Sequence, residues 1–241
     1  MTEGEWLECD RPHLLFNYLF QQASSDRKMR LFACACCRRI WHLLTDKRSR
    51  HAVEVTELNV DGAATSEELA EALAQAKKAV ANAYLCAKQL PLGKEKVSAL
   101  REAEALQVAV LLAEIEPSKR DDNWIGQVGV MASQCLVSHL PGTDLDRHTE
   151  RQREIKLRCV FLHDIFGNPF RPIAFSPSCL TTTVVSLAQV IYHKRAFHNM
   201  PELADALEEA GCTNADILAY CRQPGEHVRG CWVVDLLLGK E

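Results

Sequence analysis

The chain has 241 residues, of which 47% are hydrophobic and 25% are charged, and these ordinary globular values argue against extensive disorder. Its net charge of −4 gives no overall attraction to nucleic acid or to an anionic membrane. The longest apolar runs are shorter than the ~18 residues of a membrane span. The acidic stretch over residues 1–6 lacks the apolar segment of a secretory signal. We therefore expect a cytoplasmic protein with no membrane partner.

Helical periodicity dominates the sequence, and no stretch alternates between apolar and polar residues as a strand would. The pattern predicts an all-α fold, an irregular multi-helix bundle of about ten helices. The expected helices cover residues 12–22, 26–45, 47–60, 65–90, 95–114, 122–139, 144–166, 180–197, 201–210, 214–221 and 231–238. Residues 167–178 differ, because three prolines and two phenylalanines predict an extended strap whose rings enter the core.

We expect one helical domain over residues 1–241. The polar joint at residues 140–146 offers a possible subdivision into an N-terminal helical bundle, 1–140, and a C-terminal helical module, 146–241. Residues 31–37 are apolar on every side and mostly small, which favours a central helix. The expected core draws on Leu31, Phe32, Cys34, Ala35, Trp41, Leu85, Val108, Leu111, Val128, Phe161, Phe166, Leu187, Ile191, Leu218, Trp232 and Leu236.

Eleven cysteines are an odd number, so a complete disulfide framework is excluded. The densest group comprises Cys212, Cys221, His227 and Cys231, with gaps of eight, five and three residues. Four such ligands can form one tetrahedral zinc site. The alternative is packing in a small helical core, because cysteine is among the most buried residue types and the neighbouring helices are apolar. We favour packing, and we expect no cofactor other than this possible zinc ion.

Cysteine and histidine also recur four residues apart, which makes them neighbours on a helix face. The pairs are Cys9/His13, Cys135/His139 and Cys159/His163. Two pairs from different helices could complete one metal site. Each histidine could instead form a hydrogen bond at a helix end.

A third thiol group consists of Cys34, Cys36 and Cys37. The adjacent Arg38 and Arg39 would favour a reactive thiolate. No cysteine-hydrolase signature surrounds the group, so core packing is the interpretation that we favour.

Positive charge concentrates over residues 26–51, where eight lysines and arginines face two aspartates. Such a stretch could attract a phosphate backbone, and Trp41 could stack on a base. The alternative, which we favour, is a solvated helix rim whose arginines pair with the acidic helices at residues 67–71 and 102–116. Nucleic acid is therefore not the expected partner.

Three motifs resemble a known group of proteins. They are residues 27–39, RKMRLFACACCRR; residues 164–172, DIFGNPFRP; and residues 227–240, HVRGCWVVDLLLGK. Together with the linking helices they resemble a paralogous group of uncharacterised, cysteine-rich helical proteins of planctomycete bacteria. The resemblance implies a bacterial cytosolic protein, and it brings no activity or ligand set with it.

The functional expectation follows from what the motifs lack. No nucleotide loop, nucleophile elbow or zinc-protease motif is present, so no catalytic residue is assigned. We expect a non-catalytic protein-interaction or scaffold module with an unknown protein partner. The first alternative is a zinc-binding regulatory protein that uses Cys212, Cys221, His227 and Cys231. The second is a nucleic-acid binder that acts through the basic helix within residues 27–50.

Overall fold

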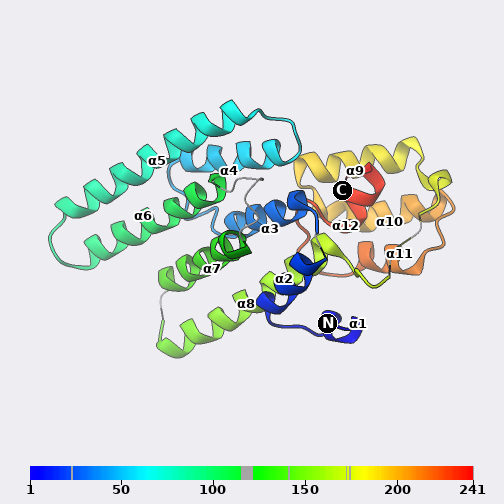
Figure 1. Ribbon diagram of the computed structural model, residues 1–241, viewed down its shortest axis with the longest axis horizontal. Helices are drawn as coiled ribbons and strands as arrows, with labels where there is room; N and C mark the ends of the chain where they lie inside the picture. The colour runs from blue at the N-terminus through cyan, green and yellow to red at the C-terminus, as the bar shows by residue number, and fades with distance from the viewer. Residues whose placement is uncertain (23, 115–121, 141, 172, 174, 241) are drawn as a thin grey trace. The chain divides into compact units, whose positions relative to one another are not determined.

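The computed structural model describes residues 1–22, 24–114, 122–140, 142–171, 173 and 175–240. These residues form twelve α-helices and two short 3-10 helices, with no strand among them, and the all-α prediction is therefore confirmed (Figure 1). The helices are α1 (Glu3–Leu7), α2 (Pro12–Gln21), α3 (Asp26–Arg39), α4 (Lys47–Val60), α5 (Ser66–Gln89), α6 (Lys94–Ala113), α7 (Asp122–His139), α8 (Asp144–Phe166), η1 (Pro177–Cys179), α9 (Thr182–Lys194), η2 (Phe197–Asn199), α10 (Met200–Glu209), α11 (Ala215–Arg222) and α12 (Trp232–Leu238). None of the described helices is long and apolar enough to cross a membrane.

The chain divides into two compact units. The N-terminal unit is Asp10–Arg158, and the C-terminal unit joins Met1–Cys9 to Cys159–Glu241. The division therefore falls inside α8, whereas the sequence suggested the joint at residues 140–146. Helix α8 is continuous across this point, and the single domain with its possible subdivision stays a prediction.

In the N-terminal unit, α3 is the central helix and packs against α4, α6 and α7. Every residue over 31–37 is buried, as the apolar pattern predicted, and Met29 and Arg30 are buried as well. The helix ends at Arg39 instead of Thr45, with Ile40 as its C-cap, and the next helix starts after Asp46, which has the extended backbone of an N-cap and accepts a hydrogen bond from the Arg48 amide. The expected burial of Leu85 is wrong, since its side chain is 59% exposed. The buried face of α5 is instead formed by small residues such as Ala72 and Ala76.

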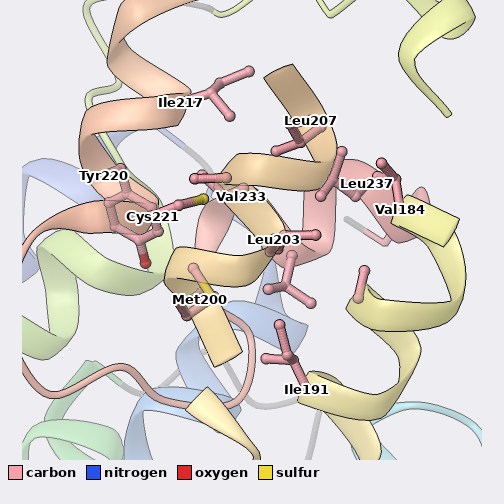
Figure 2. Packing of buried hydrophobic residues seen from close by; sticks show 14 of the residues in the cluster. Val184, Ile191, Met200, Leu203, Leu207, Ile217, Tyr220, Cys221, Val233 and Leu237 are labelled. Carbon is pink, nitrogen blue, oxygen red and sulfur yellow. The ribbon is translucent and has the colours of Figure 1, made fainter. Parts of the chain in front are cut away.

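The C-terminal unit is built on α9, α10, α11 and α12, whose apolar faces share one core. Figure 2 shows Leu203 and Leu207 of α10 among side chains from the other three helices. From the strap, Ile173 and Phe175 pack against the same core, as expected, while positions 172 and 174 lie outside the described residues. Burying a side chain of this size contributes about 1.5–3 kcal/mol, so this small core is a substantial source of stability.

Helix α1 was not predicted, although its start carries a capping box between Thr2 and Glu5. The helix buries Trp6 completely, and the indole N–H of Trp6 donates to the carbonyl oxygen of Gly167 at 3.0 Å. Gly167 follows the end of α8 with φ +64°, and a Cβ there would lie 3.0 Å from Cγ of Trp232. Glycine is therefore required both by the backbone conformation and by the close packing.

Candidate ligand-binding site

The last turn of α8 places a buried carboxylate, Asp164, in the C-terminal unit, where its side chain is 5% exposed. Its Oδ2 accepts a hydrogen bond from the Val228 amide at 2.9 Å. Its Oδ1 accepts one from the Tyr220 hydroxyl and one from Nδ1 of His227 at 2.7 Å. No lysine or arginine of the described chain pairs with Asp164, so these three donors replace its hydration.

The hydrogen bond to this carboxylate fixes the orientation of the His227 ring. An ionised carboxylate only accepts hydrogen bonds, so Nδ1 of His227 carries the proton that is shared with Asp164. The His227 side chain is 6% exposed, and its Nε2 atom is buried with no hydrogen-bond partner. The network therefore satisfies one ring nitrogen and leaves the other open.

Tyr220 and Cys231 complete the network. Burial raises the pKa of Tyr220 well above its usual value, and the neighbouring Cys231 and Asp164 raise it further. Burial, followed by the charge of Asp164, also raises the pKa of Cys231. Both groups consequently stay protonated at neutral pH, and the Tyr220 hydroxyl remains available as a donor to Asp164.

A pocket of about 580 Å³ lies over this network. Its lining residues include Glu3, Trp6, His163, Asp164, Arg171, Asp216, Ala219, Tyr220, Glu226, His227 and Trp232. The volume lies within the range of sites that hold small molecules or single side chains, about 300–1,000 Å³. All of these residues belong to the C-terminal unit, so the pocket is complete within it.

Helix α1 supplies one wall of the pocket through two sets of contacts. Nε2 of His163 donates to the carbonyl oxygen of Trp6 at 2.9 Å, and burial lowers the pKa of His163. At the rim, Glu3 pairs with Arg171 at 2.5 Å and accepts a hydrogen bond from Asn168 at 2.7 Å. This wall is thus fixed by polar contacts as well as by the buried indole of Trp6.

The four residues predicted as zinc ligands all lie in this unit, but they do not converge on one point. Cys221 is close enough to Cys212 for the two thiols to interact, and burial raises the pKa of Cys221 to about 12. His227 and Cys231 instead adjoin Tyr220 and Asp164. Within the described residues, no three His, Cys, Asp or Glu side chains are arranged to hold a metal ion. The zinc site stays a prediction for elemental analysis to test.

The other cysteine groups contribute to packing and capping. His139 bonds the carbonyl oxygen of Cys135 through Nδ1 at 2.7 Å, as a helix-end cap does, and His163 bonds the backbone of Trp6. Cys9 lies beyond the end of α1 and His13 within α2, so these two residues do not share a helix. Cys34, Cys36 and Cys37 are buried, which confirms core packing, and burial raises the pKa of Cys36 to about 12.

The basic stretch is internally paired. Arg27 bonds Asp61, Arg38 bonds Glu57 through two nitrogen atoms, and Arg39 bonds Glu154. Glu57 lies in α4, Asp61 directly follows α4, and Glu154 lies in α8. These acceptors are not in the acidic helices that the sequence suggested. Trp41 lies under the Arg38 guanidinium at 3.9 Å, so its ring already stacks within the protein. Ion pairs of this kind leave fewer cations for a phosphate backbone.

No protein-family model matches the chain, and comparison with curated proteins and with solved structures likewise gave no match. The resemblance to planctomycete proteins therefore stays a prediction. Function has to be inferred from the geometry of the site. Two residues of the site, Asp164 and Tyr220, were not singled out from the sequence. The sequence signal that could have pointed to Asp164 is its position as an aspartate within the apolar last turns of a helix.

Proposed function

We propose that this chain is a non-catalytic protein-interaction module of the cytosol, and that the pocket beside His227 holds a short segment of a partner protein. One observation carries the proposal: Nε2 of a pocket-lining histidine is buried and has no hydrogen-bond partner. Leaving such an atom unpaired costs on the order of 1–3 kcal/mol, and native proteins keep few of them. A bound segment that donates to Nε2 would offset that cost.

The protonation of the neighbouring groups supports binding over catalysis. A nucleophile acts in its deprotonated form or beside a base that takes its proton. Burial raises the pKa of Tyr220 and of Cys231, so both remain weak nucleophiles at neutral pH. His227 donates through Nδ1 to Asp164, and this bond fixes the orientation of the ring. Rigid, pre-positioned polar groups are what a specific binding pocket needs.

The proposal is tested by selecting a displayed library of random peptides against the immobilised protein. The decisive variant is Ala219→Trp, because Ala219 is exposed on α11 and lines the pocket, so a large ring there should occlude it without disturbing the core. The matched control is Ser186→Trp, an exposed position on α9 of the same unit that does not line the pocket.

We expect enriched peptides that bind the original protein and the Ser186→Trp variant equally, and the Ala219→Trp variant at least tenfold more weakly. Thermal melting of both variants checks that they are folded. Peptides that bind the Ala219→Trp variant as tightly as the original protein would show that the pocket is not the binding site. A selection that enriches no peptide would contradict the proposal as a whole.

A further inference from the structure

The pocket is lined by more carboxylates than cations. The lining carboxylates are Glu3, Asp164, Asp216 and Glu226, and the lining arginine is Arg171. That arginine is already paired with Glu3. Burial lowers the pKa of the lining His163, so this imidazole adds no positive charge at neutral pH. The lining residues of the pocket therefore carry more negative than positive charge. Cations are plentiful elsewhere in the chain, for example on helix α3.

The remaining carboxylates differ in how they are engaged. Asp164 is buried and is neutralised by no lysine or arginine of the described residues. Asp216 lies on the exposed side of α11 and forms no ion pair within the part of the chain that the structure describes. A positive group that enters the pocket would meet both charges in a partly desolvated setting, where attraction is stronger than in bulk water.

His227 and the aromatic walls set the second requirement. With its Nδ1 proton directed to Asp164, the tautomer of His227 that bears one proton offers a lone pair at Nε2, and the partner that this tautomer lacks is a donor. The rings of Tyr220 and Trp232 are packed together with centroids 4.9 Å apart, and both residues line the pocket. Aromatic faces attract ammonium and guanidinium groups.

We infer that the pocket recognises the side-chain cation of a partner segment, the ammonium of a lysine or the guanidinium of an arginine. Each group carries N–H donors for Nε2 of His227 and a positive charge for the pocket carboxylates. Its aliphatic stem can lie against the apolar lining. This inference rests on the proposed function, because it names the chemical class of the segment that occupies the same pocket.

The test uses four capped tripeptides that differ in the central residue: lysine, arginine, norleucine or glutamate, each between glycines. Binding is followed by NMR, with the ring nitrogen resonances of His227 as the direct report on Nε2. The lysine and arginine peptides should bind at least tenfold more tightly than the norleucine peptide, and their affinity should fall as salt rises. n-Butylammonium is included to ask whether the cation alone, without the peptide, is recognised.

One charge-removing variant locates the effect. Asp216→Asn should weaken the lysine peptide by about twofold to fivefold, the range of partly exposed ion pairs. The control is Glu202→Gln on α10, an exposed carboxylate of the same unit that does not line the pocket. This control should leave the affinity unchanged, and both variants are surface changes that should fold normally.

The outcomes separate this inference from the proposed function. A norleucine or glutamate peptide that binds as tightly as the lysine peptide would overturn the cation preference, and so would selected library peptides that occupy the pocket without lysine or arginine. In both cases the binding function would stand. n-Butylammonium binding as tightly as the lysine peptide would overturn the assignment to a protein segment. If Ala219→Trp weakens none of the bound peptides, the proposed function itself fails.

Discussion

Both units of this protein bury carboxylates, and one from each unit, Glu57 and Asp164, shows two different ways of satisfying such a group. In the N-terminal unit, Glu57 has a 3% exposed side chain and accepts two hydrogen bonds from Arg38, at 2.9 and 2.7 Å. In the C-terminal unit, Asp164 accepts from a hydroxyl, a backbone amide and an imidazole. The first arrangement is a closed ion pair, whereas the second leaves a buried ring nitrogen open. The comparison teaches that burial of charge alone does not mark a site; what distinguishes Asp164 is that its histidine partner lines a pocket and keeps a ring nitrogen without a hydrogen-bond partner.

The largest effect should come from removing each carboxylate in turn. Asp164→Ala removes the buried carboxylate that accepts hydrogen bonds from Tyr220, His227 and Val228, and we expect a loss of about 3–5 kcal/mol of unfolding free energy. Glu57→Ala should cost less, about 1–3 kcal/mol, because the Arg38 side chain is 22% exposed and can turn to water. Urea denaturation of both variants gives the comparison, and equal losses would contradict it.

A smaller effect is expected from Gly167→Ala, which tests the wall of the pocket. The left-handed backbone and the short distance to Trp232 should together cost about 1–3 kcal/mol. Gly4→Ala is the matched control in the same unit, because a Cβ there meets nothing within 4 Å and alanine favours a helix. Thermal unfolding should show a lower Tm for Gly167→Ala alone, and a similar drop in both variants would argue against the role given to Gly167.

Acid should weaken the C-terminal unit through His163. Burial lowers its pKa in the folded protein below the unfolded value of about 6.5, so the unfolded chain binds more protons as the pH falls through that value. Stability should therefore decline below about pH 6.5, by at most about 1.4 kcal/mol per pH unit from this group.

The variant His163→Gln keeps a donor for Trp6 but has no titrating ring. Its unfolding free energy should change less between pH 7 and pH 5 than that of the original protein. The exposed His198, replaced by asparagine, serves as the control in the same unit. If the unfolding free energy of the glutamine variant depends on pH as it does in the original protein, His163 is not the group that causes the loss of stability in acid.

The smallest effect concerns metal. Because Cys212 and Cys221 lie apart from the Asp164 network, we expect elemental analysis to find less than one zinc ion per chain and chelation to leave Tm unchanged. One zinc ion per chain, together with a lower Tm after chelation, would restore the site of three cysteines and one histidine and change the interpretation of His227.

Helix positions were largely predictable because their causes are local. Pro12 at the start of α2 and the Thr65–Glu68 capping box of α5 are readable in a few residues of sequence. The site was only partly predictable. His227 was singled out for its spacing to cysteines, yet its partner Asp164 lies 63 residues away in the chain. Periodicity indicates which face of a helix is buried, but not which polar group from another helix will meet it there.

The composition of the C-terminal unit has a consequence for synthesis. Residues Met1–Cys9 belong to this unit, but Asp10–Arg158 must be translated before its remaining residues exist. Translation proceeds at about 5–20 residues per second, so Gly167, whose carbonyl oxygen accepts from the Trp6 indole, is synthesised on the order of ten seconds after Trp6. During that interval a large ring that is fully buried in the finished protein is exposed on the ribosome. The N-terminal unit can fold in the meantime, so the C-terminal unit closes last.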